Sequence, residues 1–147
     1  MKAKIVQDLR PYNTAAIVTE DMALRGMVQL FVEHPELHSL CVVDDTGNLR
    51  GLVNRKDLFH AIFSHQVPAS SMVKKLYTLL TSEHASDLLV KHVHTCKETD
   101  SLDDVINQMI SNHLDAVPVV REDGKLEGII NVERLFKEWL EQEKPSS

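Results

Sequence analysis

The sequence predicts an α+β fold made of two copies of one β-α-β-β-α unit. The first reason is an internal repeat: residues 42–54 align with residues 119–131 without a gap, at a constant offset of 77 positions. The second reason is that, in each copy, a helical periodicity precedes two short apolar runs joined by a glycine-containing turn. We expect copies over about residues 5–63 and 84–142, a connecting segment over 64–85 and a disordered tail over 143–147.

Composition and charge narrow the class of protein. The chain has 147 residues, of which 43% are hydrophobic and 26% charged, as is typical of a globular protein. The net charge of −6 and the lack of a basic run argue against binding to nucleic acid or anionic lipid. No apolar stretch approaches the ~20 residues of a membrane span, and the amino terminus has no apolar signal region. Cys41 and Cys96 form no disulfide framework, so we expect a cytoplasmic protein without membrane or nucleic-acid partners.

Each copy contains an amphipathic helix near its start. The apolar residues of these helices recur at i, i+3, i+4 and i+7, which places them on one helical face. They are Leu24, Met27, Val28 and Phe31 in the first copy, and Leu102, Val105, Ile106 and Met109 in the second. The offset between the two sets is 78, so the first copy carries a one-residue insertion around residues 33–38.

A β-hairpin is expected after each of these helices. The predicted strands are residues 40–43 and 49–53 in the first copy, and 116–120 and 126–130 in the second. The turns between them contain Gly47 and Gly124. Glycine suits a hairpin turn because it adopts positive φ without steric cost.

A second helix is expected after each hairpin, over residues 56–63 and 132–142. The apolar residues of the later helix are expected to point inward: Leu135, Phe136, Trp139 and Leu140. A unit of roughly 60 residues is marginally stable alone, so we expect the two sheets to pack against each other. Between the copies, residues 72–80 predict an extra helix that is apolar over much of its surface, either a brace across the repeats or a subunit contact.

This repeated pattern resembles a pair of cystathionine-β-synthase (CBS) domains, the tandem called a Bateman module, over about residues 5–142. The resemblance rests on an apolar strand, a hairpin turn that ends in glycine (Asp-x-x-Gly in the first copy) and a Gly-hydrophobic-hydrophobic sequence before the final helix, found twice in the same order. It implies two pseudo-symmetric units with a ligand cleft on each side. In this family the clefts commonly take adenosyl ligands, so the implied ligands are AMP, ADP, ATP or S-adenosylmethionine, with no catalytic cofactor. Family members also pair through helices, which implies a homodimer.

The family's ligand motif ends in an aspartate, which in the first copy is Asp57. The matching segment is residues 51–57, where Asn54 replaces the usual hydroxyl residue. A carboxylate can accept hydrogen bonds from both hydroxyls of a ribose, and the N–H groups of a helix start favour phosphate. The resemblance therefore implies that Asn54, Arg55 and Asp57 bind the ligand. The alternative is that Asp57 merely caps its helix while Arg55 lies on a solvated face.

The resemblance also implies that the first strand of the opposite repeat completes each cleft. For the Asp57 site this strand covers residues 91–95, and for the second site it covers 13–17. The ligand-lining residues implied for the Asp57 site are Lys91, His92, Val93 and His94. In the second copy the motif contains Asn131 but ends in Arg134. Because arginine has only donors, this second site is expected to be degenerate or altered toward a more anionic ligand.

Other chemistry is less well supported. On a strand, His92, His94 and Cys96 would project from one face and could approach a metal ion, but adjacent ligands on one strand rarely enclose an ion, so no metal site is predicted. Cys41 lies in an apolar run, which favours an inert core residue over a nucleophile. The sequence has no phosphate-binding glycine loop and no nucleophile elbow, so no catalytic residue is predicted.

The sequence thus predicts a non-enzymatic regulatory module that binds an adenosyl ligand in the cleft between its repeats. Ligand binding would shift the population of its states and relay occupancy to an unknown protein partner. The alternative is a structural protein-interaction module with degenerate ligand sites, in which the helix over residues 72–80 contacts the partner.

Overall fold

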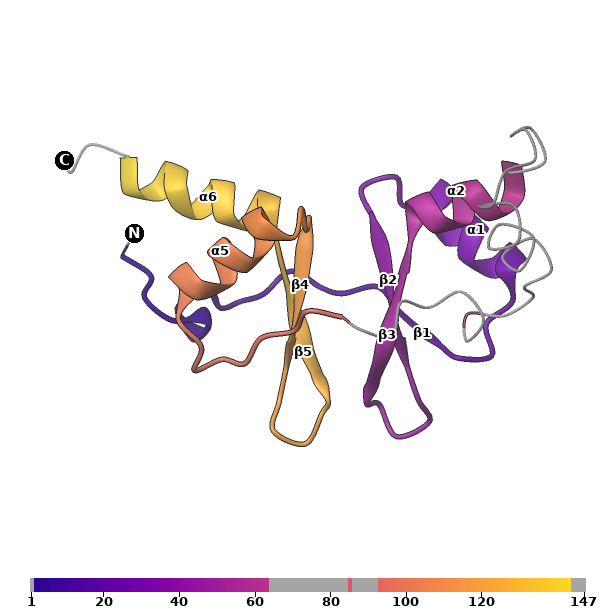
Figure 1. Cartoon of the computed structure of the whole chain (residues 1–147), viewed down its shortest axis with the longest axis horizontal. Helices are drawn as coiled ribbons and strands as arrows, with labels where there is room; N and C mark the ends of the chain where they lie inside the picture. Colours follow the sequence, from indigo (N-terminus) through magenta and orange to yellow (C-terminus); the bar gives the residue numbers. More distant parts are fainter. Residues whose placement is uncertain (1, 64–84, 86–92, 144–147) are drawn as a thin grey trace. The chain divides into compact units, whose positions relative to one another are not determined.

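The computed structural model of the chain describes residues 2–63, residue 85 and residues 93–143. It contains two compact units: unit 1 combines Met1–Ala15 with His94–Ser147, and unit 2 is Ala16–Val93. Each unit combines a small β-sheet with helices (Figure 1), so the predicted α+β class is confirmed. The predicted helix over residues 72–80 lies outside the described residues. In the ranges given above, none of the helices has the length and apolarity that crossing a bilayer requires.

Unit 2 contains most of the first sequence repeat. Its elements are β1 (Ile17–Thr19), α1 (Leu24–Glu33), β2 (Ser39–Val43), β3 (Leu49–Asn54) and α2 (Arg55–Phe63). Strand β2 is central, with β1 paired to it in parallel and β3 antiparallel. The core forms where α1 and α2 pack their apolar residues on this sheet, and it includes Val18, Met27, Phe31, Leu40, Val42, Val53 and Leu58.

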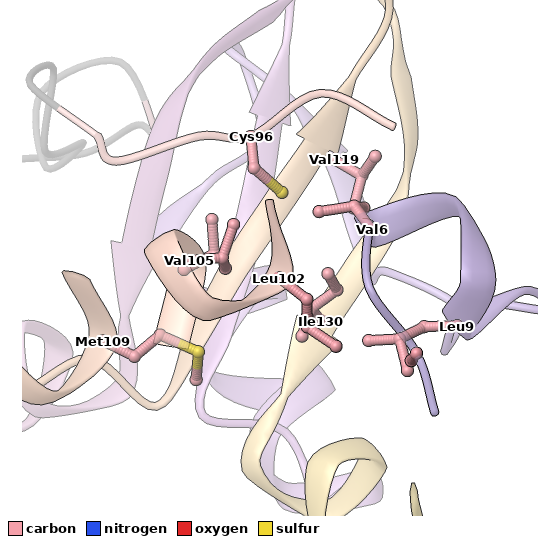
Figure 2. Close-up of a cluster of buried hydrophobic side chains, with 10 residues drawn as sticks. Val6, Leu9, Cys96, Leu102, Val105, Met109, Val119 and Ile130 are labelled. Atoms are coloured by element: carbon pink, nitrogen blue, oxygen red, sulfur yellow. The ribbon is translucent and has the colours of Figure 1, made fainter. Parts of the chain in front are cut away.

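Unit 1 contains most of the second sequence repeat. Its elements are the 3-10 helix η1 (Val6–Leu9), α5 (Leu102–Ser111), β4 (Ala116–Val120), β5 (Leu126–Asn131) and α6 (Val132–Glu143). Strands β4 and β5 form an antiparallel pair. Figure 2 shows side chains from η1, α5 and both strands meeting in one core: Val6, Leu9, Cys96, Leu102, Val105, Met109, Val119 and Ile130.

The two hairpins are built alike, as the offset of 77 predicts. Both have a register shift near the turn, after Val42 in the first and after Val119 in the second. Gly47 and Gly124 lie in the turns with φ of 89° and 85°, a conformation that a residue with a Cβ rarely adopts. The predicted hairpins and their turn glycines are confirmed.

The amino-terminal segment (residues 3–13) packs in unit 1, with the second repeat. Ala3, Val6 and Leu9 are buried in the core of unit 1. The backbone N–H of Val6 donates to the carbonyl of Asp100 at 3.0 Å. Isolated β-bridges join Ile5 to Ser101 and Asn13 to Ile129. This segment is therefore a structural part of unit 1, whereas unit 2 begins at Ala16.

The strands implied at the start of each repeat differ from the observed ones. Residues 93–95 are irregular, and pairing begins instead at Cys96, which bridges Val119 in parallel. In the first repeat, β1 begins only at Ile17. The physical reason in the second repeat is that Cys96 supplies an apolar side chain that the core buries, whereas His94 is exposed.

Helix α6 buries less of its apolar face than the sequence predicts. Leu135 packs against the core of unit 1, but Phe136, Trp139 and Leu140 are 63%, 56% and 58% exposed. The prediction that all four point inward is wrong for the last three. A sheet of two strands covers one side of a helix, so much of the apolar stripe of α6 extends past what the sheet can bury.

Candidate functional site

The candidate site in unit 2 lies where β3 passes directly into α2. Strand β3 ends at Asn54 and α2 begins at Arg55, so Asp57 is the third residue of the helix. Asn54 and Asp57 are half-buried, whereas Arg55 is exposed. The structure therefore brings these three predicted residues together at a helix start, where backbone N–H groups and the helix dipole attract anions.

Arg55 is also held by the loop that follows α1. Its backbone N–H donates to the carbonyl of His38 at 2.9 Å, and its Nη1 donates to the carbonyl of Pro35 at 3.4 Å. In the same loop, Nδ1 of His34 lies 3.4 Å from Oε1 of Glu36. The one-residue insertion of the first repeat falls in this loop, so it lies beside the predicted ligand site.

Two of the residues implied to complete this site, Lys91 and His92, lie outside the described residues. Val93 is half-buried and belongs to unit 2, whereas His94 is exposed and belongs to unit 1. The roles of all four residues toward a ligand stay predictions of the sequence.

In unit 1, Asn131 occupies the position that Asn54 has in unit 2, at the end of a strand and directly before a helix. Its Oδ1 accepts a hydrogen bond from the backbone N–H of Arg134 at 2.9 Å and another from Nδ2 of Asn13 at 2.8 Å. The first bond satisfies an N–H at the start of α6, as an N-cap does. The second bond attaches the amino-terminal segment to the helix start, so the Asn131 oxygen has two partners within the chain.

Arg134 takes the helix position that corresponds to Asp57. Its Nε and Nη2 donate to the carbonyl of Leu9 at 3.2 and 3.0 Å, and its Nη1 lies 3.4 Å from Oε2 of Glu138. The side chains of Arg134 and Glu138 are only 11% and 13% exposed. The guanidinium group thus bridges α6 and the amino-terminal segment.

A pocket of about 310 Å³ lies beside these contacts. Its lining residues are Pro11, Tyr12, Asn13, Glu133, Arg134 and Lys137. Sequence reasoning missed Pro11, Tyr12, Glu133 and Lys137 as lining residues. The signal that could have found Tyr12 is Gly128: a Cβ built on this glycine would lie 2.6 Å from the Tyr12 Cβ, so the two segments approach more closely than a side chain allows.

Tyr12 also belongs to a polar cluster that the amino-terminal segment forms with Glu98. Its hydroxyl donates to Oε1 of Glu98 at 3.1 Å, and Arg10 forms an ion pair with the same oxygen. The hydrogen bond from Arg10 lowers the pKa of Glu98, while partial burial raises the pKa of Tyr12. This cluster holds residues 10–12 against the loop that precedes α5.

A second hollow of about 420 Å³ lies between α5 and α6. It is lined mainly by apolar side chains, together with His113 and Asp115. The lining includes Ile110 and Phe136, which are among the large exposed apolar residues of the chain. The hollow therefore belongs to an apolar helix face and carries few polar groups for a small ligand.

Among the residues that the structure describes, the cysteines and histidines do not form a metal-binding group. Burial raises the pKa of both Cys41 and Cys96 to about 12, which keeps the thiols protonated. His94 is exposed while Cys96 is buried, so the idea that they share one face is wrong. Over residues 2–63, 85 and 93–143, no cluster of His, Cys, Asp or Glu is arranged to hold a metal ion.

In each unit, the last strand of the hairpin leads directly into a helix that has polar residues at its start. Two such matched units define a tandem-repeat α+β module. The chain belongs to the CBS domain family: a model of the CBS domain matches residues 6–64 and 85–141.

Comparisons with individual proteins agree with this family. The chain is 33% identical over 135 residues to a homoserine O-acetyltransferase of Methanobrevibacter ruminantium, a match that covers 92% of this chain and 24% of the relative. The chain thus spans about a quarter of the length of the first curated relatives it matches.

Solved structures show the same fold. The structure of CBSX2 of Arabidopsis thaliana in complex with AMP has a TM-score of 0.78 and 23% identity, and the match covers 97% of this chain and 100% of that one. The CBS domain pair of protein MJ0100, in complex with 5′-methylthioadenosine and S-adenosyl-L-methionine, has a TM-score of 0.70 and 18% identity, with coverage of 92% and 98%.

Proposed function

We propose that this chain is a non-enzymatic regulatory module that binds an adenosyl ligand at the start of α2. The observation that carries the proposal is the position of Asp57, half-buried in the first turn of α2 and three residues after Asn54. A carboxylate there can accept hydrogen bonds from both hydroxyls of a ribose. Exposed Arg55 and Lys56, with the helix dipole, favour a phosphate group on the same ligand. The relatives solved with AMP or S-adenosyl-L-methionine support the adenosyl class.

The rest of the proposed site follows from the repeat. In unit 1, Pro11, Tyr12 and Asn13 line the pocket beside α6. Asp8-Leu9 and Asp87-Leu88 match at an offset of 79, which makes residues 90–92 the sequence counterparts of Pro11, Tyr12 and Asn13. We therefore propose Lys91 and His92, with Val93 and His94 after them, as the segment that completes the Asp57 site.

A thermal-shift assay with AMP, ATP and S-adenosylmethionine tests this proposal. A ligand at 100 times its Kd stabilises the folded state by about 2.7 kcal/mol. For a chain of this size that corresponds to a rise in Tm of about 5–11 °C. We expect the wild type to show this rise, Asp57→Ala to lose it, and the ligand to be recovered chemically unchanged.

The matched control is Asp104→Ala. Asp104 is also the third residue of its helix, α5, but it lies exposed and away from the β3–α2 junction. This variant should keep the full ligand response. A chain that responds to none of the three ligands, or an Asp57→Ala variant that responds like the wild type, would show that the proposal is wrong.

We also propose that the chain forms a homodimer through its helices. Large apolar residues are exposed at matched positions of the two repeats: Val32 and Ile110, Phe59 and Phe136, Phe63 and Leu140. Each chain therefore exposes the same kind of apolar face once in each repeat. A second copy of the chain exposes the same two faces and is a suitable partner. Light scattering coupled to gel filtration should give twice the chain mass for the wild type and for Thr46→Asp in a hairpin turn. Phe136→Asp should shift the population to monomer, and an unchanged mass would contradict the proposal.

The alternative function is a structural protein-interaction module with degenerate ligand sites. The internal bonds of Asn131 and Arg134 favour it for the second repeat. The two functions differ in how ligand binding affects a protein partner. If the chain is a regulatory module, AMP changes the amount of partner that co-purifies with it. If the chain is purely structural, AMP leaves that amount unchanged.

A further inference from the structure

The geometry points to Arg134 as a lining residue of the second-repeat pocket whose donors are engaged within the chain, so that each chain binds a single adenosyl ligand, at the first repeat. This inference rests on the proposed function and adds which of the two repeats binds the ligand. Arg134 and Asp57 are related by the repeat offset of 77, and each is the third residue of the helix that follows a hairpin. The two residues therefore hold equivalent positions but offer opposite chemistry: Asp57 accepts hydrogen bonds, and Arg134 only donates them.

The donors of Arg134 are directed at the chain itself. A guanidinium group has five N–H donors, and here three of them have partners: two contact the Leu9 carbonyl and one contacts the Glu138 carboxylate. Because the side chain is only 11% exposed, these bonds are shielded from water. A ligand that needed this position would have to break them, which lowers its affinity roughly tenfold or more.

The remaining polar groups of the pocket are also poorly placed for a nucleotide. The Asn131 oxygen already accepts from the Arg134 N–H and from Asn13. Glu133 adds a negative charge to the lining, which disfavours a phosphate, and offsets the positive charge of Lys137. At the position equivalent to Asp57, this lining therefore offers a donor, Arg134, in place of a carboxylate acceptor.

The bridge also explains what Arg134 does in place of a ligand. It joins the carbonyl of Leu9, in the amino-terminal segment, to α6 beside the pocket. A ligand would connect the amino-terminal segment to α6 only while it is bound, whereas Arg134 makes this connection within the chain itself. We therefore expect the contact between the amino-terminal segment and α6 to be present whether or not the first repeat holds a ligand.

Isothermal titration calorimetry of the full chain with AMP, combined with hydrogen exchange, tests the inference. The wild type should bind one AMP per chain, and Asp57→Ala should bind none. Exchange in residues 51–60 should slow on addition of AMP, while exchange in residues 131–137 stays unchanged. A stoichiometry of two, one equivalent of AMP bound by Asp57→Ala, or protection of residues 131–137 by AMP would each overturn the inference.

Ligand-free hydrogen exchange separates this inference from the proposed function. In Arg134→Met, the Leu9 carbonyl loses both donors, so the amides of Val6 and Gln7, which bond to the Asp100 and Glu98 carbonyls, should exchange roughly tenfold faster. Arg134→Lys, which keeps the charge and some donors, should give an intermediate rate, and Arg121→Met in an exposed turn should change nothing. Equal exchange in Arg134→Met and wild type would overturn the bridge itself. If no ligand binds anywhere but Arg134→Met shows the faster exchange, the proposed function fails while the bridge stands.

Discussion

Gly128→Ala and Gly26→Ala make the same chemical change, yet the structure predicts opposite effects on stability. A Cβ on Gly128 in β5 would lie 2.6 Å from the Tyr12 Cβ, 3.1 Å from its Cδ2 and 3.2 Å from its Cγ. The nearest atom is attached directly to the backbone of residue 12, so a side-chain rotation cannot relieve the contact. A Cβ on Gly26 in α1 would meet nothing nearer than Met22 Cγ at 3.6 Å, an ordinary contact.

The magnitudes follow from these distances. Overpacking a buried site lowers the free energy of unfolding by about 1–3 kcal/mol. Replacing glycine by alanine raises it by about 0.4–1 kcal/mol, because the unfolded chain loses conformational freedom. Gly128→Ala should therefore destabilise the fold by about 1–2 kcal/mol. Gly26→Ala, inside a helix, should stabilise it by about 0.5–1 kcal/mol. The two variants should differ in Tm by about 3–12 °C.

Thermal and urea unfolding followed by circular dichroism measure this difference. A double-mutant cycle assigns the cost to the contact: in a Tyr12→Gly background, which has no Cβ at residue 12, Gly128→Ala should cost much less. Shifts of the same sign for Gly128→Ala and Gly26→Ala, or an unchanged cost in the Tyr12→Gly background, would refute the reasoning.

Three further predictions concern single residues. Burial raises the pKa of Cys41 and Cys96 to about 12, so neither thiol should react with a disulfide reagent in the folded protein at mildly alkaline pH, and both should react in urea. His113 follows α5 with φ of 53°, which costs a non-glycine residue roughly 1–2 kcal/mol, so His113→Gly should stabilise the fold by up to ~1 kcal/mol in urea unfolding. The hydrogen bond from Arg10 lowers the pKa of Glu98 from 4.5, so this contact stabilises the fold above pH 4.5 and is lost as the pH falls through the folded pKa. The gap in urea midpoint between wild type and Glu98→Gln should therefore stay constant from neutral pH to about 4.5 and narrow as the pH falls further.

Each of these predictions has a clear contrary result. Reaction of either cysteine in the folded state would contradict the observed burial. A His113→Ala variant that gains as much stability as His113→Gly would show that backbone conformation is not the cause. A gap between wild type and Glu98→Gln that widens in acid would contradict the direction of the Glu98 pKa shift.

The sequence predicts those parts of the fold that depend on local chemistry. The hairpin turns at Gly47 and Gly124 need positive φ, and few residues other than glycine supply it. Helices α1 and α5 show a clear apolar periodicity, and both include all the residues that show it. Helix α6 shows the limit of this reasoning: periodicity identifies residues that share a face, but it does not indicate whether an element covers that face, as the exposed Trp139 illustrates.

The candidate site was predictable to a similar extent. The junctions that hold Asp57 and Arg134 follow directly from the repeat. The bond from Asn13 to Asn131 spans 118 positions and the bond from Arg134 to Leu9 spans 125, and no local pattern encodes such contacts. The sequence therefore identified Arg134 as unusual but could not show that its donors are used by the amino-terminal segment.

The placement of residues 3–13 in unit 1 affects how the protein forms during synthesis. Leu9 is synthesised well before its partner, because it contacts Arg134 across 125 positions. Contacts of such long range are slow to form, since a large loop must close first. Nascent chains that carry every residue up to the start of α6 still lack the Leu9 contact, so removing residues 3–13 should damage the second repeat.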